Sequence, residues 1–173
     1  MSEGIGARVL RKEDKRFITG RGRYTDDIKA DKQAYAAFVR SPHAHAIIRG
    51  IDAKVAEETS GVIGVMNGSQ LTGDGIGNII CGWAISSKDG SPMNMGAWSA
   101  LATEKVRYVG DAVAVVIAES QETARNAAEL VEVDYDVLPA VVNSVESLQN
   151  NACQIHENAP GNLIFEWEIG NLS

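Results

Sequence analysis

A chain of 173 residues is long enough for one domain with extensions, and for a core that needs no disulfide or metal. Its apolar content of 45% is that of a globular protein. The net charge of −7 at pH 7 argues against nucleic acid as a partner, because phosphate binding needs a basic face. The basic residues between 8 and 16 are interrupted by Glu13 and Asp14.

Targeting signals are not visible in the sequence. Residues 1–6 hold no apolar signal core, and no stretch approaches the apolar length of a membrane span. We therefore expect a cytoplasmic protein. Cys81 and Cys153 lie far apart with no Cys-x-x-Cys pairing, so we expect reduced thiols.

Residues 1–33 are polar, charged and punctuated by glycine, which predicts an extended N-terminal arm with turns. Two strand candidates follow, at 34–39 and 46–51. Arg40-Ser41-Pro42 separates them, because proline cannot continue a hydrogen-bond ladder.

A short helix and a third strand come next. Asp52 is the expected cap of the helix, and Gly61 lies just past its end. The strand is predicted over 62–66 and closes at the turn signal Asn67-Gly68. Residues 68–100 then form an irregular, glycine-rich excursion, within which 79–81 and 83–85 are candidates for short strands.

The most regular part of the sequence is a strand, a helix and a further strand. Residues 113–118 form a continuous apolar run, rich in β-branched residues, which is typical of a strand buried on both faces. Ser120 is a plausible N-cap for a helix over 120–132. The helix places one apolar face toward the core: Ala124, Ala127, Ala128 and Val131. The second strand is predicted over 131–135.

Beyond Pro139 we expect one helical turn at 145–148 and a strand with alternating apolar residues near the end. That strand would carry Leu163, Phe165, Trp167 and Ile169 on one face. The excursion adds large apolar side chains at Trp83, Met93, Met95 and Trp98. Two interpretations stay open: an exposed interaction surface, through which the chain self-associates or which leaves the loop mobile, or segments that fold back into the core.

His43 and His45 would point the same way on a strand, as paired metal ligands do. A structural zinc site needs four ligands. The remaining histidine, His156, is distant in sequence. A structured turn between two strands is the favoured interpretation.

Other candidate motifs are equally weak. Residues 73–77 lack the last glycine of a dinucleotide-binding loop, because Asn78 stands in its place, and they are interpreted as a flexible loop. The carboxylate pairs at 26–27 and 57–58 are interpreted as solvated surface. We therefore assign no residue to catalysis, to cofactor binding or to a metal.

Several segments, in order, resemble the N-terminal domain of the molybdenum-binding large subunit of the xanthine dehydrogenase/aldehyde oxidase family, and look closest to the carbon monoxide dehydrogenase large subunit. The resemblance covers about residues 4–170. It is carried by 20–28 (GRGRYTDDI), 38–46 (FVRSPHAHA), 51–52, 61–62, 106–118, 124–135 and 138–140, with Asn162 where a similar asparagine precedes the first cofactor-binding domain.

The resemblance implies an α/β (α+β) hammerhead fold, a mixed β-sheet with packed helices. The domain would span 34–148, between the arm at 1–33 and an extension at 149–173 that leads toward absent cofactor domains. Family enzymes oxidise carbon monoxide or hydroxylate a carbon with water as oxygen source. Their molybdenum–pterin, [2Fe–2S] and FAD groups would lie on downstream domains or partner subunits, with none in this chain.

The sequence thus predicts a non-catalytic domain of a molybdenum hydroxylase large subunit, itself inactive as an oxidoreductase. Its expected partners are the molybdopterin-binding domains and the iron–sulfur and flavin subunits, with self-association as a further expectation. One rival is a free-standing binding module that uses the excursion to hold a small ligand or protein. A second rival is a small metalloprotein using His43, His45 and either Cys81 or Cys153.

Overall fold

The structure is a computed structural model that describes residues 4–6 and 10–170. It divides into two compact units, 1–33 and 34–173, and each is described by itself. Residues 1–3 and 7–9 of the predicted arm and 171–173 of the predicted extension lie outside the described residues.

The first unit contains a short helix, α1 (Asp14–Ile18), and a 3-10 turn, η1 (Thr25–Asp27). The rings of Phe17 and Tyr24 stack with centroids 5.4 Å apart. A Cβ at Gly22 would lie 2.5 Å from the Phe17 ring, so glycine allows this close packing. The sequence analysis missed α1 because a single turn offers no apolar periodicity to detect.

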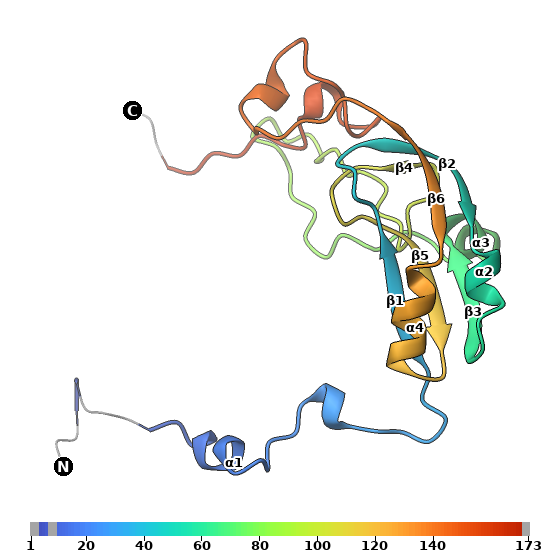
Figure 1. The fold of residues 1–173 in the computed structure, drawn as a ribbon. Helices are drawn as coiled ribbons and strands as arrows, with labels where there is room; N and C mark the ends of the chain where they lie inside the picture. Colours follow the sequence, from blue (N-terminus) through green and yellow to red (C-terminus); the bar gives the residue numbers. More distant parts are fainter. Residues whose placement is uncertain (1–3, 7–9, 171–173) are drawn as a thin grey trace. The chain divides into compact units, whose positions relative to one another are not determined.

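Two three-stranded sheets form the second unit, with orders β1-β5-β3 and β4-β2-β6 (Figure 1). Every pairing between the described strands is antiparallel. The strands are β1 (Tyr35–Arg40), β2 (Ala46–Asp52), β3 (Val62–Asn67), β4 (Lys105–Val106), β5 (Ala112–Ala118) and β6 (Glu132–Val137). The helices are α2 (Lys54–Glu57), α3 (Gly68–Gly73) and α4 (Gln121–Ala128), with 3-10 turns η2 (Glu146–Leu148) and η3 (Pro160–Asn162).

The predicted strand–helix–strand segment is present as β5, α4 and β6, but its two strands lie in different sheets. The predicted strands at 34–39, 46–51 and 62–66 are confirmed within one or two residues at either end as β1, β2 and β3. The α/β fold class is confirmed, and the sheet region consists of two antiparallel sheets.

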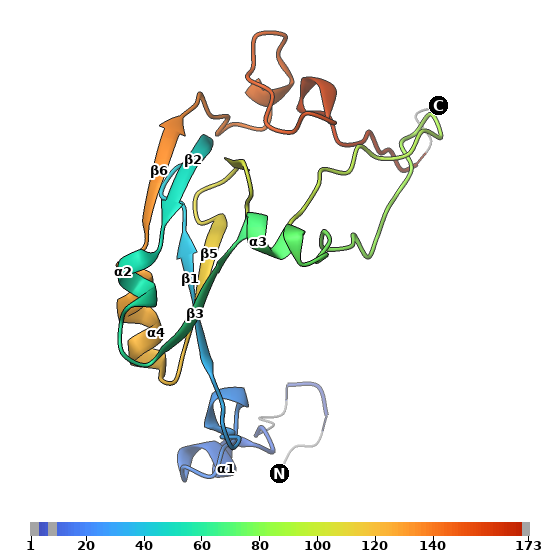
Figure 2. The same cartoon turned by 90° about the vertical axis from the view of Figure 1, so that its right-hand side faces the viewer.

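Helix α4 covers one face of the central strand β5 (Figures 1 and 2). The Ser120 hydroxyl accepts a hydrogen bond from Thr123 N at 3.0 Å, which confirms the predicted N-cap. Ala127 of the helix and Ala114 and Val116 of the strand are fully buried in one cluster. Small side chains on both elements let the helix approach the sheet closely. The helix ends at Ala128, four residues before the predicted end.

The opposite face of β5 is less covered than predicted. Val113 is fully buried in a second cluster with Ala46, Ala102 and Val106, but Val115 and Ile117 are only half-buried. No described helix covers them as α4 covers the other face. The expectation of a strand buried on both faces is therefore wrong beyond Val113.

The turn signal Asn67-Gly68 ends β3 and begins helix α3. Asn67 Oδ1 accepts from Gln70 N at 3.0 Å, and Gln70 Oε1 accepts from Asn67 N at 2.8 Å. This reciprocal capping box starts α3, so the strand ends where it was predicted to end, but a capped helix follows it in place of a turn. Gly68 is buried, and a Cβ there would lie 2.5 Å from Ala102 O.

The predicted short strands at 79–81 and 83–85 and the predicted strand over 163–169 are not formed as ladders. Within the excursion there is one isolated bridge, between Ser86 and Pro92. The predicted helical turn at 145–148 is confirmed as η2. Among the described residues, no helix is both long and apolar enough to cross a membrane.

We predict that Ala127→Asp strongly destabilises the protein. The substitution places a carboxylate in a fully buried site without a partner, which costs several kcal/mol. Asn126→Asp is the matched control, because Asn126 is exposed on the same helix. Chemical denaturation measures the difference, and equal midpoints for the two variants would show that α4 is packed in another orientation.

We also predict that Gly68→Ala lowers the midpoint of thermal unfolding, because its Cβ would overlap two backbone carbonyls, those of Leu101 and Ala102. Gly73→Ala, in the same helix and with open space around its Cβ, is the control. It should be neutral or stabilising by up to about 1 kcal/mol, since alanine favours helix. Loss of stability in Gly73→Ala alone would contradict this packing.

Candidate functional site

A groove of about 910 Å³ lies between the glycine-rich excursion and the segment that follows β6. Figure 2 shows both segments running to the same side of the sheets. We call it the excursion groove, and its main lining comes from residues 78–81, 93–98, 141–147 and 155–164. Apolar side chains dominate: Ile79, Ile80, Met93, Met95, Trp98, Val141, Val142, Ile155 and Ile164. A concave, mostly apolar surface with few polar groups is the common form of a binding site.

Asn162 organises the C-terminal wall of the groove. Its Nδ2 donates to Ser147 O at 3.0 Å and to Cys153 O at 2.9 Å, and its Oδ1 accepts from Ile155 N at 2.8 Å. The residue has φ of 58°, a left-handed conformation that asparagine tolerates better than most residues. The sequence analysis singled out Asn162 only through the family resemblance, since nothing in the local pattern shows three backbone partners.

Ionic contacts anchor the same wall to the strand region. Glu157 pairs with Lys105 Nζ at 2.6 Å and with Arg107 Nη2 at 2.8 Å. Arg107 Nε also donates to Ile155 O at 3.0 Å. The Lys105 and Arg107 hydrogen bonds hold the pKa of Glu157 at about 2, well below its usual value. The only charged side chain that lines the excursion groove, that of Arg107, is therefore already paired in the described structure.

His156 is the titratable group of the groove wall. Burial lowers its pKa, and the positive charge of Arg107 lowers it further. A Cβ at Gly96 would lie 2.6 Å from His156 Nδ1, so the excursion and the wall meet closely here. We expect a neutral imidazole at pH 7, which suits an apolar contact surface.

The predicted turn at His43 and His45 is confirmed. His45 Nδ1 donates to Pro139 O at 2.7 Å, whereas the His43 ring packs edge-on against Tyr135 at 5.1 Å. Ser41 Oγ accepts from His43 N at 3.0 Å. The two imidazoles serve different structural contacts and do not converge on a shared ligand.

The described residues bring together no cluster of metal ligands. None of them forms a group of three or more His, Cys, Asp or Glu side chains that could hold a metal. An iron–sulfur cluster needs several thiolates. The chain has two cysteines, of which Cys81 is exposed and Cys153 donates to Pro139 O at 3.1 Å. The lining of the excursion groove offers apolar contact and hydrogen bonding.

The predicted apolar residues of the excursion and the C-terminal segment do not fold into the core. Trp83, Trp98 and Trp167 are 83%, 58% and 67% exposed, and Ile169 is 85% exposed. Met93 alone among the predicted excursion residues is half-buried. Of the two interpretations left open by the sequence, these exposures favour the exposed apolar surface, while self-association stays a prediction.

We predict that the Glu157 carboxylate titrates near pH 2 in the folded protein. Because this pKa is depressed by folding, its stabilising contribution is complete above the unfolded value and is lost as the pH falls from about 4.5 to about 2. An NMR titration that follows the carboxyl carbon of Glu157 measures this pKa. The contribution is small because Glu157 is largely exposed. Arg107→Leu should raise the pKa, and a midpoint near 4.5 in the unmodified chain would contradict the pairing.

Comparisons with known proteins show which family shares this sequence and fold. The sequence pattern described as "Aldehyde oxidase and xanthine dehydrogenase, a/b hammerhead domain" matches residues 19–139. The carbon monoxide dehydrogenase large chain of Afipia carboxidovorans is 33% identical over 189 aligned positions, which cover 98% of this chain and 21% of that protein. The nicotine 6-hydroxylase large subunit of Paenarthrobacter nicotinovorans is 40% identical, over 84% of this chain and 17% of that protein.

Solved structures agree. The crystal structure of a Cu,Mo-CO dehydrogenase in its carbon monoxide reduced state superposes with a TM-score of 0.68 at 34% identity, covering 87% of this chain and 18% of that chain. The chain thus spans about a fifth of the length of the relatives that it matches. It belongs to the aldehyde oxidase and xanthine dehydrogenase family, as an α/β hammerhead domain.

Proposed function

We propose that the chain is the non-catalytic hammerhead domain of a molybdenum hydroxylase large subunit. One observation carries the proposal: the family match covers nearly all of this chain but about a fifth of each relative. The described residues of that fifth offer apolar surface and no group of metal ligands. The domain's work is then mechanical: it packs against the remaining domains and helps to wall the substrate route.

The proposal extends to the complete enzyme. The large subunit holds molybdenum–pterin on its other domains, and [2Fe–2S] and FAD groups lie on partner subunits or domains. The enzyme oxidises carbon monoxide or hydroxylates a carbon with water as oxygen source, and it is cytoplasmic. The names of the relatives, a Cu,Mo-CO dehydrogenase and a nicotine 6-hydroxylase, support the molybdenum and the two kinds of reaction.

The excursion groove is the proposed contact with the rest of the large subunit. Ile80 lines the groove and is 89% exposed. Large apolar side chains that are this exposed generally mark a surface that contacts another domain or protein. Asn158 Nδ2 donates to Met95 O, so the two walls of the groove are joined and present one surface.

We predict that Ile80→Glu in the complete large subunit weakens assembly and lowers molybdenum content per subunit, because it places a charge in an apolar interface. Ile63→Glu is the control: Ile63 is 61% exposed, lies on β3 and does not line the groove. Metal analysis and size-exclusion chromatography measure both. Equal molybdenum content in the two variants would show that the groove is not the contact.

The 173-residue chain gives an independent test. Purified alone, it should contain no stoichiometric molybdenum, iron or flavin and should show no dye-linked oxidation. Molybdenum at one atom per chain together with turnover would overturn the non-catalytic role.

A second function is favoured by the size of the excursion groove. A volume of about 910 Å³ with an apolar lining could hold a small apolar ligand in a free-standing module. A reading frame or neighbouring gene that encodes the cofactor domains favours the first function. Their absence, together with saturable binding of one apolar molecule per chain, favours the second.

A further inference from the structure

The glycine-rich excursion meets the C-terminal wall of the excursion groove at Gly96 and His156. A Cβ at Gly96 would lie 2.6 Å from Nδ1 and 3.0 Å from Cε1 of the His156 ring, so the ring lies directly against the glycine backbone. Gly96 does not have a positive φ, so the ring, and not the backbone conformation, opposes a side chain at this position. The hydrogen bond from Asn158 Nδ2 to Met95 O joins the two segments one residue away.

The His156 ring lies between two cavities. It lines the excursion groove and also a second, smaller cavity of about 230 Å³. Within the described residues, His156 makes hydrogen bonds only through its backbone carbonyl, so its ring nitrogens have no partner in the protein. A proton on this half-buried ring would therefore add a charge and a donor at a contact that offers no acceptor.

The charges around the ring come from the strand region and from its own segment. The excursion lines both cavities with uncharged side chains, the Cys81 thiol among them. The positive charge of Arg107 opposes a charged ring, whereas Asp111 and Glu157 favour it, and Glu157 is already paired with Lys105 and Arg107. The other titratable side chains near the ring are those of His45 and, across the second cavity, Glu104 and Tyr108. Burial and Arg107 prevail, and the pKa of His156 is lowered.

We propose that Gly96 and His156 form a pH-sensitive latch. The neutral ring holds the excursion against the C-terminal wall, and a proton taken up from solvent releases it, which separates the two walls of the excursion groove. The effect of this release on contact with the rest of the large subunit rests on the proposed function.

The direction of the pH dependence follows from the cost of a charged ring in the closed contact. Because closure lowers the pKa of His156, the latch's contribution is complete above the value of a free histidine, about 6.5. It is lost as the pH falls through the pKa of the closed state. Acid therefore opens the excursion, while the two sheets stay folded.

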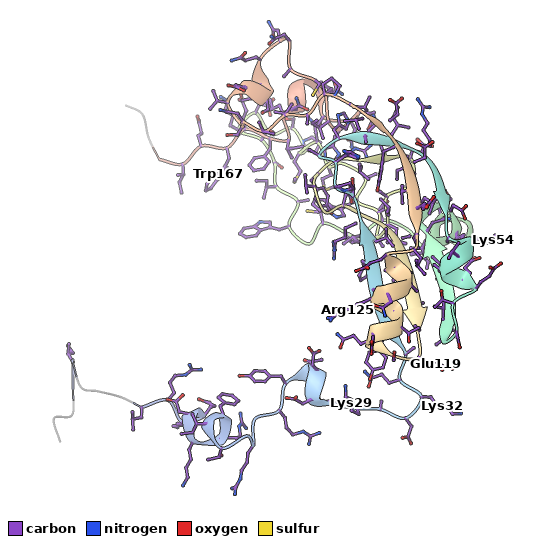
Figure 3. The ribbon with its side chains drawn as sticks, in the orientation of Figure 1. Lys29, Lys32, Lys54, Glu119, Arg125 and Trp167 are labelled. Carbon is purple, nitrogen blue, oxygen red and sulfur yellow. The ribbon has the colours of Figure 1, made fainter. Side chains whose placement is uncertain are left out.

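Two backbone hydrogen bonds report whether the excursion is closed. Asn94 N donates to Ile164 O and Lys88 N donates to Glu166 O, both at 2.8 Å, and both bonds join the excursion to the C-terminal segment. Figure 3 marks Trp167 on that segment, away from the two sheets, and the two bonds lie outside the sheet ladders. These amides exchange with solvent when the excursion opens, whereas amides of strand β5 need a larger unfolding.

Hydrogen exchange of the Asn94 amide as a function of pH tests the latch. We expect its protection factor, corrected for the intrinsic exchange rate, to fall by about threefold or more between about pH 8 and about pH 5. In His156→Gln, whose side chain does not titrate, the factor should stay constant over this range. His43→Gln is the control, because His43 packs against Tyr135 and does not line the groove, and it should behave as the unmodified chain does.

Substitution of Gly96 tests the contact at a single pH. At about pH 8, Gly96→Ala should lower the protection of the Asn94 amide by about tenfold, because its methyl group overlaps the His156 ring. The same substitution in a His156→Ala background should have little effect, since the ring is gone. Gly82→Ala, also in the excursion but with open space around its Cβ, is the control.

A constant protection factor in the unmodified chain, or a fall with pH that persists in His156→Gln, would overturn the latch. Equal effects of Gly96→Ala with and without the His156 ring would overturn it as well. These measurements use the 173-residue chain without cofactors, so they are independent of the molybdenum content and assembly that test the proposed function.

Discussion

The fold depends on the close contact between helix α4 and strand β5. Ala127, Ala114 and Val116 are fully buried there, and side chains this small leave no room for a charge or a longer residue. The same strand sends Val113 into the second cluster, and Val39 and Ile51 contact both clusters. One strand with two differently packed faces therefore joins two sheets that share no hydrogen-bond ladder.

The excursion and the C-terminal wall have a different kind of stability. Few buried apolar residues hold them, and Asn162, Glu157 and Arg107 supply hydrogen bonds and ion pairs in their place. Polar contacts at exposed positions contribute little each, because water competes for the same groups. The regions that carry the excursion groove are thus expected to open more easily than the two sheets.

Sequence patterns were sufficient where one local rule governed the outcome. The β-branched run of β5 and the cap at Ser120 are visible without any tertiary knowledge. Sequence patterns failed where the structure depends on contacts between residues that are distant in sequence. Asn67-Gly68 fits both a hairpin and a capped helix, and Gln70 decides for the helix through its reciprocal hydrogen bond. Apolar and other residues alternate in segment 163–169 as they do in a strand. The segment, however, makes only isolated backbone hydrogen bonds to the excursion and forms no ladder. The groove could not be predicted, because it joins residues more than 60 positions apart, as in the Asn158–Met95 hydrogen bond.

Exposed large side chains are distributed differently in the two sheets and in the excursion with the C-terminal segment. An independently stable domain covers large apolar groups, yet here tryptophans 83, 98 and 167 all stay exposed and all lie on the excursion or the C-terminal segment. The buried positions of the two sheets, by contrast, hold alanine and valine, among them Ala46, Ala114 and Val116. The three tryptophans of the chain therefore lie where they contribute least to the core. A chain built in this way has its strongest unmet hydrophobic driving force directed outward, toward another polypeptide surface.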